Sequence, residues 1–171
     1  MKIRKDIFDN ELDLTNKCLG CEIVNKNIQT PFGIMLETYN FVVFQDPEIP
    51  IPGFMIINSK RHIKSILNME RQEYSELMNL VYKVRKTMMN LTEIIDVVII
   101  QKELSPHFHL WLMPRYEWMT NNSALGLSHG KLSDFTEAIK YSKEHHKNDT
   151  NISKIKECCE IIRKALNSNI E

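Results

Sequence analysis

The hydrophobic pattern of this chain changes its period twice, which restricts the folds open to it. Short apolar runs alternate with turn residues from 31 to 59, and the proline-rich segment 46–52 separates the last run from the others. From Glu70 to Leu91 apolar side chains instead recur every three or four residues, the spacing of one helical face. One long helix between two groups of strands predicts an α+β fold with an antiparallel sheet. The strands are expected at 31–38, 40–45, 53–59, 96–101 and 107–113.

The remaining segments predict how the chain is organised. Residues 1–17 are mostly polar and charged and indicate an N-terminal lead-in. After residue 118, the segments 133–146 and 152–166 each have the pattern of a helix. At 171 residues the chain is long enough for one domain with a substantial core. We therefore expect a main domain at 18–118 and a C-terminal helical extension of the same domain at 119–171.

Charge and hydropathy argue against several classes of partner. The chain has 22 basic and 22 acidic side chains and a formal net charge of zero, so we expect neither a nucleic-acid polymer nor a membrane surface as partner. No apolar run is long enough to span a bilayer, and the N-terminus lacks the apolar core of a signal peptide. A cytoplasmic location is the expectation. In that reducing compartment the four cysteines are expected to be thiols or metal ligands.

A pair of cysteines has the spacing of metal ligands. The segment "CLGC" places Cys18 and Cys21 three residues apart, an arrangement common at zinc sites. Two imidazoles would complete a tetrahedral set, and His62 and His107 are the candidates. The alternative is a pair of ordinary thiols in a loop.

The segment "HFHLWLM" carries the most unusual pattern in the sequence. Alternation along a strand places His107, His109 and Trp111 on one face of the sheet, and Phe108 and Leu110 on the other, which the long helix can cover. An imidazole near pH 7 keeps a lone pair on one nitrogen, with which it can attack phosphorus or carry a proton. The alternative is two half-buried histidines whose rings are satisfied by the backbone.

Taken together, these segments resemble the histidine-triad (HIT) family. The signature of that family has three histidines alternating with apolar residues, often followed by Pro-Arg, and "HFHLWLMPR" is similar to it. The order of the other pieces also agrees: a CxxC, a hairpin ending at Asp46, a proline-rich loop and a strand leading to His62. The resemblance covers about Cys18 to Trp118.

The resemblance implies a fold, a site and an assembly. It implies a HIT-like five-stranded antiparallel sheet with one long helix, commonly paired as a homodimer with a continuous sheet. His109 has the position of the nucleophile, which attacks the α-phosphorus of a nucleoside phosphoramidate or a dinucleoside polyphosphate such as diadenosine tetraphosphate. Water then resolves the nucleotidyl-histidine. Asp46 falls where the family binds ribose hydroxyls. In members with a CxxC the first histidine, here His107, is a ligand of structural zinc, so the expected zinc ligands are Cys18, Cys21, His62 and His107.

The sequence departs from the family at two places. Trp111 replaces the third histidine, and an indole donates one N–H but cannot exchange a proton. We expect Trp111 to line the nucleotide pocket as a flat wall. The glycine-rich approach to the motif is also missing, which leaves Gln101 and Ser105 as the expected polar contacts for phosphate.

Three functions are compatible with these residues. The first is a HIT-type hydrolase or nucleotidyltransferase with His109 as nucleophile. The second is a nucleotide-binding module of the same fold with little or no turnover, because Trp111 cannot assist a leaving group. The third is a purely structural domain with zinc and a dimer interface. A covalent label on His109 would distinguish the first from the second.

Overall fold

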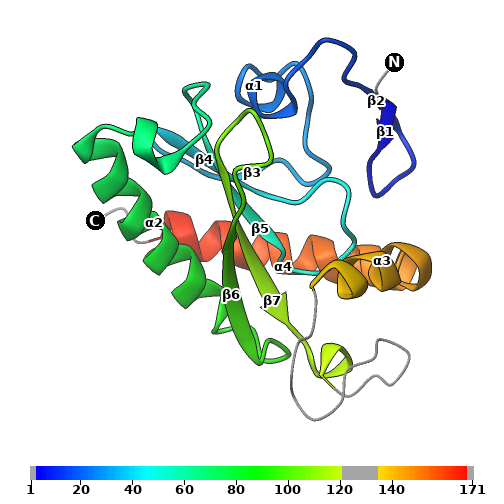
Figure 1. The fold of residues 1–171 in the computed structure, drawn as a ribbon. Helices are drawn as coiled ribbons and strands as arrows, with labels where there is room; N and C mark the ends of the chain where they lie inside the picture. The colour runs from blue at the N-terminus through cyan, green and yellow to red at the C-terminus, as the bar shows by residue number, and fades with distance from the viewer. Residues whose placement is uncertain (1–2, 121–134, 169–171) are drawn as a thin grey trace.

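The computed structural model describes residues 3–120 and 135–168, and its centre is a five-stranded antiparallel sheet (Figure 1). The strand order is β3-β4-β5-β7-β6, so the two strands after the long helix return to the edge of the sheet beside β5. The predicted α+β fold is therefore confirmed. The strands are β3 (Ile34–Glu37), β4 (Phe41–Gln45), β5 (Met55–Ser59), β6 (Asp96–Gln101) and β7 (His109–Arg115).

Helices α2 (Arg71–Met88) and α4 (Asp149–Asn167) pack on one face of the sheet and build the main core. α2 buries the side of the helix that carries Leu77, Val81 and Val84, as its apolar spacing predicts. The buried strand residues on this face include Phe41, Val43, Met55, Ile57, Leu110 and Leu112. In Figure 1, α4 runs behind strands β6 and β7.

α4 also covers the edge strand β3. The Arg163 Nε donates to the Ile34 carbonyl at 3.2 Å, and the Asn167 amide donates to the Met35 carbonyl at 3.0 Å. Backbone groups at the edge of a sheet invite pairing with another chain, and these side chains occupy them. The C-terminal extension thus protects one edge of the sheet, whereas the other edge strand, β6, lies on the opposite side.

The opposite face of the sheet carries α1 (Leu19–Val24) and a second, smaller cluster. Ile23 of α1 packs on Val42, Phe44 and Ile56 of β4 and β5. Because both faces are covered, every residue of β4 and β5 is buried. This face presents Asn58, His109 and Trp111 beside α1, because Asn58 pairs with His109 and Ile56 pairs with Trp111 across β5 and β7.

The N-terminal segment contains structure that the sequence did not predict. Within the lead-in 1–17, β1 (Ile3–Lys5) and β2 (Glu11–Asp13) form a small antiparallel hairpin. Its connecting turn buries Ile7, whose N–H donates to the Pro47 carbonyl at 2.8 Å. The hairpin strands are only three residues long and largely exposed, so their alternation leaves no apolar stripe to recognise.

The short helix α3 (Phe135–His145) lies between the main domain and α4. Its C-terminal end packs on η2 (Glu117–Met119), where the Trp118 ring lies 4.6 Å from the His146 ring. A further 3-10 turn, η1 (Ile66–Asn68), precedes α2. Within the described residues, no helix has both the length and the apolar character required to cross a membrane.

Strand β7 begins two residues later than predicted and ends two later. His107 and Phe108 precede it because the Phe108 N–H donates to the Ile63 carbonyl, outside the sheet. At the other end the strand continues through Pro114 to Arg115, paired only with β6, since pairing with β5 stops at Leu112. A proline is tolerated where its missing N–H has no strand to face.

Candidate functional site

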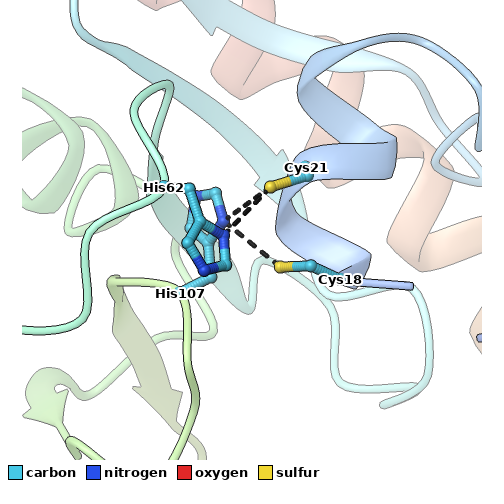
Figure 2. Close-up of side chains that lie close together, drawn as sticks. All are labelled: Cys18, Cys21, His62 and His107. Carbon is cyan, nitrogen blue, oxygen red and sulfur yellow. Dashed lines mark hydrogen bonds between the residues drawn. The ribbon is translucent and has the colours of Figure 1, made fainter. Parts of the chain in front are cut away.

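Four side chains from separate parts of the chain meet at one point beside α1 (Figure 2). Cys18 and Cys21 come from the start of α1, His62 follows β5, and His107 precedes β7. Their sulfur and nitrogen atoms all lie within 4.8 Å of one another. Cys18 Sγ is 3.3 Å from His107 Nδ1, and Cys21 Sγ is 3.1 Å from His62 Nδ1. The structure thus brings together the four residues that were expected to hold zinc.

The residues around this cluster hold His107 in a fixed orientation. His107 Nε2 donates to the Ser59 carbonyl at 2.7 Å, which leaves Nδ1 with the lone pair toward the cysteines. Asn58 Nδ2 lies 3.3 Å from the same ring nitrogen and also donates to the Ser59 carbonyl at 3.0 Å. Gly20 lies directly against the ring, because a Cβ there would be 2.7 Å from His107 Cγ. Only glycine in the middle of "CLGC" lets α1 approach this closely.

The protonation behaviour of the cluster fits a cation site. Burial lowers the pKa of His107, so its imidazole is neutral, the form that binds metal. Burial raises the pKa of Cys21 to about 11, and a hydrogen bond to Cys18 and the Cys18 charge act in the same direction, because a second thiolate beside the first is unfavourable. Two sulfurs and two imidazole nitrogens are the donor set of tetrahedral zinc sites. The residues present therefore fit zinc.

His109 follows the cluster by two residues and is connected to it through the backbone. Its Nδ1 lies 3.1 Å from the His107 carbonyl oxygen. A carbonyl can only accept, so Nδ1 carries the proton and the lone pair of the neutral ring is on Nε2. Asn58, the cross-strand partner of His109, contacts His107 as well. The segment that carries His107 therefore also sets the tautomer of His109.

Trp111 occupies the next position along the same face. Its ring centroid lies 5.9 Å from that of His109, with the planes tilted by 45°. Phe54 contacts the indole edge-to-face at 5.5 Å, and Ile56 pairs with it across the sheet. These contacts fix the indole as an apolar wall.

A cavity of about 530 Å³ opens beside these residues, a size in the range of small-molecule sites. Asn58, His107, His109 and Trp111 line its sheet side. Its apolar part is formed by side chains from α1, β4 and β5 and from the proline-rich loop: Leu19, Ile23, Phe44, Ile49 and Ile56.

Asp46 lines this cavity from the point where β4 ends and the proline-rich loop begins. Its Oδ1 accepts from the backbone N–H groups of Glu48 at 2.8 Å and Ile49 at 3.0 Å. Burial raises the pKa of Asp46 to about 7 against these two hydrogen bonds, and Lys143 acts in the lowering direction. Asp46 thus lines the cavity as a carboxyl that titrates near neutral pH.

The two residues expected to contact phosphate have different places. Ser105 lines the cavity, and its hydroxyl accepts from the His107 N–H at 3.3 Å. Gln101 pairs with Leu110, so it belongs to the face covered by α2, and it is not among the cavity-lining residues. The expectation that Gln101 lies with His109 needs correction, because its register with β7 turns it to the other face.

Several residues of the site have little signal in the sequence. Asn58 is a polar residue within an apolar strand, and Gly20 is the glycine inside the CxxC; both could have been singled out. Four basic side chains that line the cavity have no local signature, because packing of the terminal segments brings two of them there: Arg4, Lys17, Lys102 and Lys143.

No protein-family model matches the sequence, and neither does any curated protein. Solved structures do match. A hypothetical histidine triad nucleotide-binding protein from Sulfolobus tokodaii aligns with a TM-score of 0.61 at 15% identity, covering 88% of this chain and 93% of that one. A Zn-bound histidine triad family protein from Mycobacterium smegmatis aligns with a TM-score of 0.59 at 15% identity, covering 88% and 94%. A Hit-like protein from Bartonella henselae aligns with a TM-score of 0.60 at 15% identity, covering 88% of this chain and 97% of that one.

These likenesses show that the chain has the HIT fold along most of its length. The predicted resemblance is thus confirmed at the level of fold. At 15% identity the roles of individual residues rest on the geometry of this chain.

Proposed function

We propose that this chain, which has the HIT fold, is a nucleotidyl hydrolase or nucleotidyltransferase that acts on the α-phosphate of a nucleotide. The observation that carries the proposal is the 3.1 Å contact between His109 Nδ1 and the His107 carbonyl, which leaves the Nε2 lone pair for attack in a ring that lines the cavity. The substrate is a nucleoside phosphoramidate or a dinucleoside polyphosphate such as diadenosine tetraphosphate.

The proposed reaction has two displacements at phosphorus. The Nε2 lone pair of His109 forms a bond to the α-phosphorus, and the bond from phosphorus to the leaving group breaks with its electron pair. Water or another acceptor then attacks the same phosphorus, and the P–N bond returns its electron pair to Nε2. The hydrogen bond from Nδ1–H to the His107 carbonyl stabilises the positive charge that the ring gains in the intermediate.

The nucleoside end of the substrate is proposed to lie toward Asp46. Its carboxyl lines the cavity and would accept from the ribose hydroxyls, next to the apolar side chains of Phe44 and Ile49 that would contact the base. Ser105 would contact a phosphate oxygen. Trp111 would form the wall beside the phosphate and has no proton to give a leaving group.

Zinc is proposed to be structural in this protein. When bound by Cys18, Cys21, His62 and His107, it would have four protein ligands and no open position for a substrate. It would fix the segment that precedes β7 against α1 and so hold the carbonyl that orients His109.

A nucleotide-binding module with little turnover is the alternative, and one observation favours it. Trp111 stands where the family has its third histidine, so no imidazole at this position assists the leaving group. Phe54 packs against the indole edge-to-face and holds it in place. Binding would then use the same cavity, with His109 as a contact for phosphate.

The protein is further proposed to be a homodimer. Strand β6 is an edge strand; Ile99 within it and Ile95 just before it are about half exposed. On α2, Met78 and Tyr82 are also exposed, and the helix is attached to β6 where Arg85 Nε donates to the Val97 carbonyl at 3.1 Å. A second copy of the chain would cover these apolar side chains.

A substrate panel run with the natural protein and with His109→Ala tests the enzymatic proposal. Turnover of at least one nucleotide by the natural protein, and its loss in His109→Ala with nucleotide binding retained, is the expected result. Binding without turnover in either protein would favour the binding module instead.

A further inference from the structure

We infer that the cavity selects nucleotides with a polyanionic chain beyond the α-phosphate, and that Arg4, Lys17, Lys102 and Lys143 are the residues that make this selection. The inference rests on the proposed function, because it concerns the leaving-group side of the same cavity. These four residues would distinguish polyphosphate substrates from phosphoramidates, which share the α-phosphate but lack the further phosphoryl groups.

The four basic residues come from four separate segments around the cavity. Arg4 is in β1, Lys17 precedes α1, Lys102 follows β6, and Lys143 is in α3. Three of them, Arg4, Lys17 and Lys143, therefore come from outside the segment that resembles the HIT family. A chain with no net charge thus places four positive side chains around one cavity of about 530 Å³.

One carboxylate holds two of these side chains. Arg4 Nη1 lies 2.9 Å from Glu48 Oε1, and Lys143 Nζ lies 4.0 Å from Glu48 Oε2. Glu48 is largely buried, whereas Arg4 and Lys143 keep more than two-fifths of their side-chain surface exposed. The exposed parts of the two cations remain available to a ligand, and the shared carboxylate sets their position.

The hairpin and α3 are fixed to each other, so this arrangement does not depend on Glu48 alone. Lys147, just after α3, donates to the Asp6 carbonyl at 3.0 Å and forms an ion pair with Asp9 at 2.6 Å. Asn151 at the start of α4 donates to the Pro50 carbonyl at 2.8 Å. The two terminal segments thus form one wall over the proline-rich loop.

The other two cations lie on the segments beside the histidines. Lys17 adjoins the first cysteine of the metal cluster, and Lys102 begins the loop that leads to His107. Within 3–120 and 135–168, neither Lys17 nor Lys102 forms an ion pair. Unpaired cations near a proposed site of attack on phosphorus are suited to bind phosphate oxygens.

The balance of charge decides which substrate fits best. Four cations face Glu48 and an Asp46 that is only partly ionised near neutral pH, which leaves an excess of about two to three positive charges. A phosphoramidate brings about one negative charge, whereas a polyphosphate chain brings about one for each phosphoryl group. Only a polyphosphate chain carries enough negative charge to neutralise the positive charge of the cavity.

Calorimetric titration of AMP and of ATP into the His109→Ala protein tests the inference without turnover. We expect ATP to bind at least tenfold more tightly than AMP at low salt, with the difference shrinking as salt rises. Lys102→Gln and Lys143→Gln should each weaken ATP binding by about five- to tenfold and AMP binding by less than twofold. Lys156→Gln is the control, since Lys156 is an exposed lysine of α4 outside the cavity.

The outcomes separate the inference from the function on which it rests. If AMP binds as tightly as ATP, or if the cavity variants and Lys156→Gln behave alike, the inference is overturned while the nucleotide site stands. If neither nucleotide binds, the proposed function fails and the inference fails with it.

Discussion

The carbonyl oxygen of His107 lies 3.1 Å from Nδ1 of His109, so one hydrogen bond connects a residue of the metal cluster to the proposed nucleophile. The side chain of His107 contacts Cys18 and Cys21, and its carbonyl oxygen contacts the ring of His109 two residues on. Any change that moves this segment would alter both the cation site and the lone pair of His109.

Removal of a cluster cysteine should release the metal and destabilise the fold. We predict about one zinc per chain in the natural protein and none in Cys18→Ala, with a melting temperature lower by about 5–10 °C. Elemental analysis and a thermal melt measure the two quantities. Cys158→Ala is the matched control, because Cys158 is a free cysteine of α4 outside the cluster and should keep its zinc. Equal metal content in both variants would contradict the assignment.

The free energy of unfolding should decrease as pH rises, because of Asp46. Its pKa is raised from 3.8 to about 7 in the folded protein, so between these values the folded state holds a proton that the unfolded state has released. The stabilisation is complete below about pH 4 and is lost as pH rises through about 7, by up to about 4 kcal/mol.

Urea unfolding at pH 5 and pH 8 measures this dependence. We expect Asp46→Asn to lack most of the drop in unfolding free energy between the two pH values, because an amide does not titrate. Glu11→Gln removes an exposed carboxylate of β2 and should leave the drop unchanged. A drop between pH 5 and pH 8 that is as large in Asp46→Asn as in the natural protein would show that the Asp46 carboxyl does not cause it.

Restoring an imidazole at position 111, where the family has its third histidine, should speed the reaction of substrates with poor leaving groups. We predict that Trp111→His raises phosphoramidate turnover about tenfold or more, since an imidazole can donate a proton to the departing amine. The same change loses contacts with Phe54 and costs about 1–3 kcal/mol of stability. Trp111→Phe keeps a flat wall without an acid and should give no gain. Equal turnover by the two variants would show that proton donation at this position is not limiting.

A substitution that places a charge on the edge strand β6 tests the proposed homodimer. Light scattering of the natural protein should give about twice the 20.1 kDa mass of the chain, and Ile99→Glu on β6 should reduce it to the mass of a monomer. Leu67→Glu, at an exposed side chain outside α2 and β6, should remain dimeric. A monomer mass for the natural protein at micromolar concentration would refute the proposal.

The sequence predicted those features that depend on local period or on short spacing. The change from strand to helix period located α2, and the CxxC with two histidines named the four residues whose side chains the structure brings together as possible metal ligands. The helix and the cysteine pair follow from short spacing, because side chains two, three or four residues apart have fixed relations in a strand or a helix. His62 and His107 are distant in the sequence, and the resemblance to the HIT family named them.

Features that depend on register or on packing over long distances were not predicted. Gln101 was expected to contact phosphate, but its side chain lies on the face of Leu110, and a single sequence does not reveal this pairing. Lys143 reaches the cavity because α3 packs on the N-terminal hairpin, and the hairpin itself has strands too short to recognise. Arg4 was missed for the same reason.

Trapping of the covalent intermediate tests the proposed reaction most directly. The protein is mixed with a nucleoside phosphoramidate and with a dinucleoside polyphosphate labelled at the α-phosphorus, quenched in alkali and mapped by mass spectrometry. We predict a nucleotidyl group on His109 that is absent from His109→Ala and retained in His145→Ala, whose ring lies on α3 away from the cavity lining. Turnover without any label on His109, or full turnover by His109→Ala, would contradict the assignment of His109 as the nucleophile.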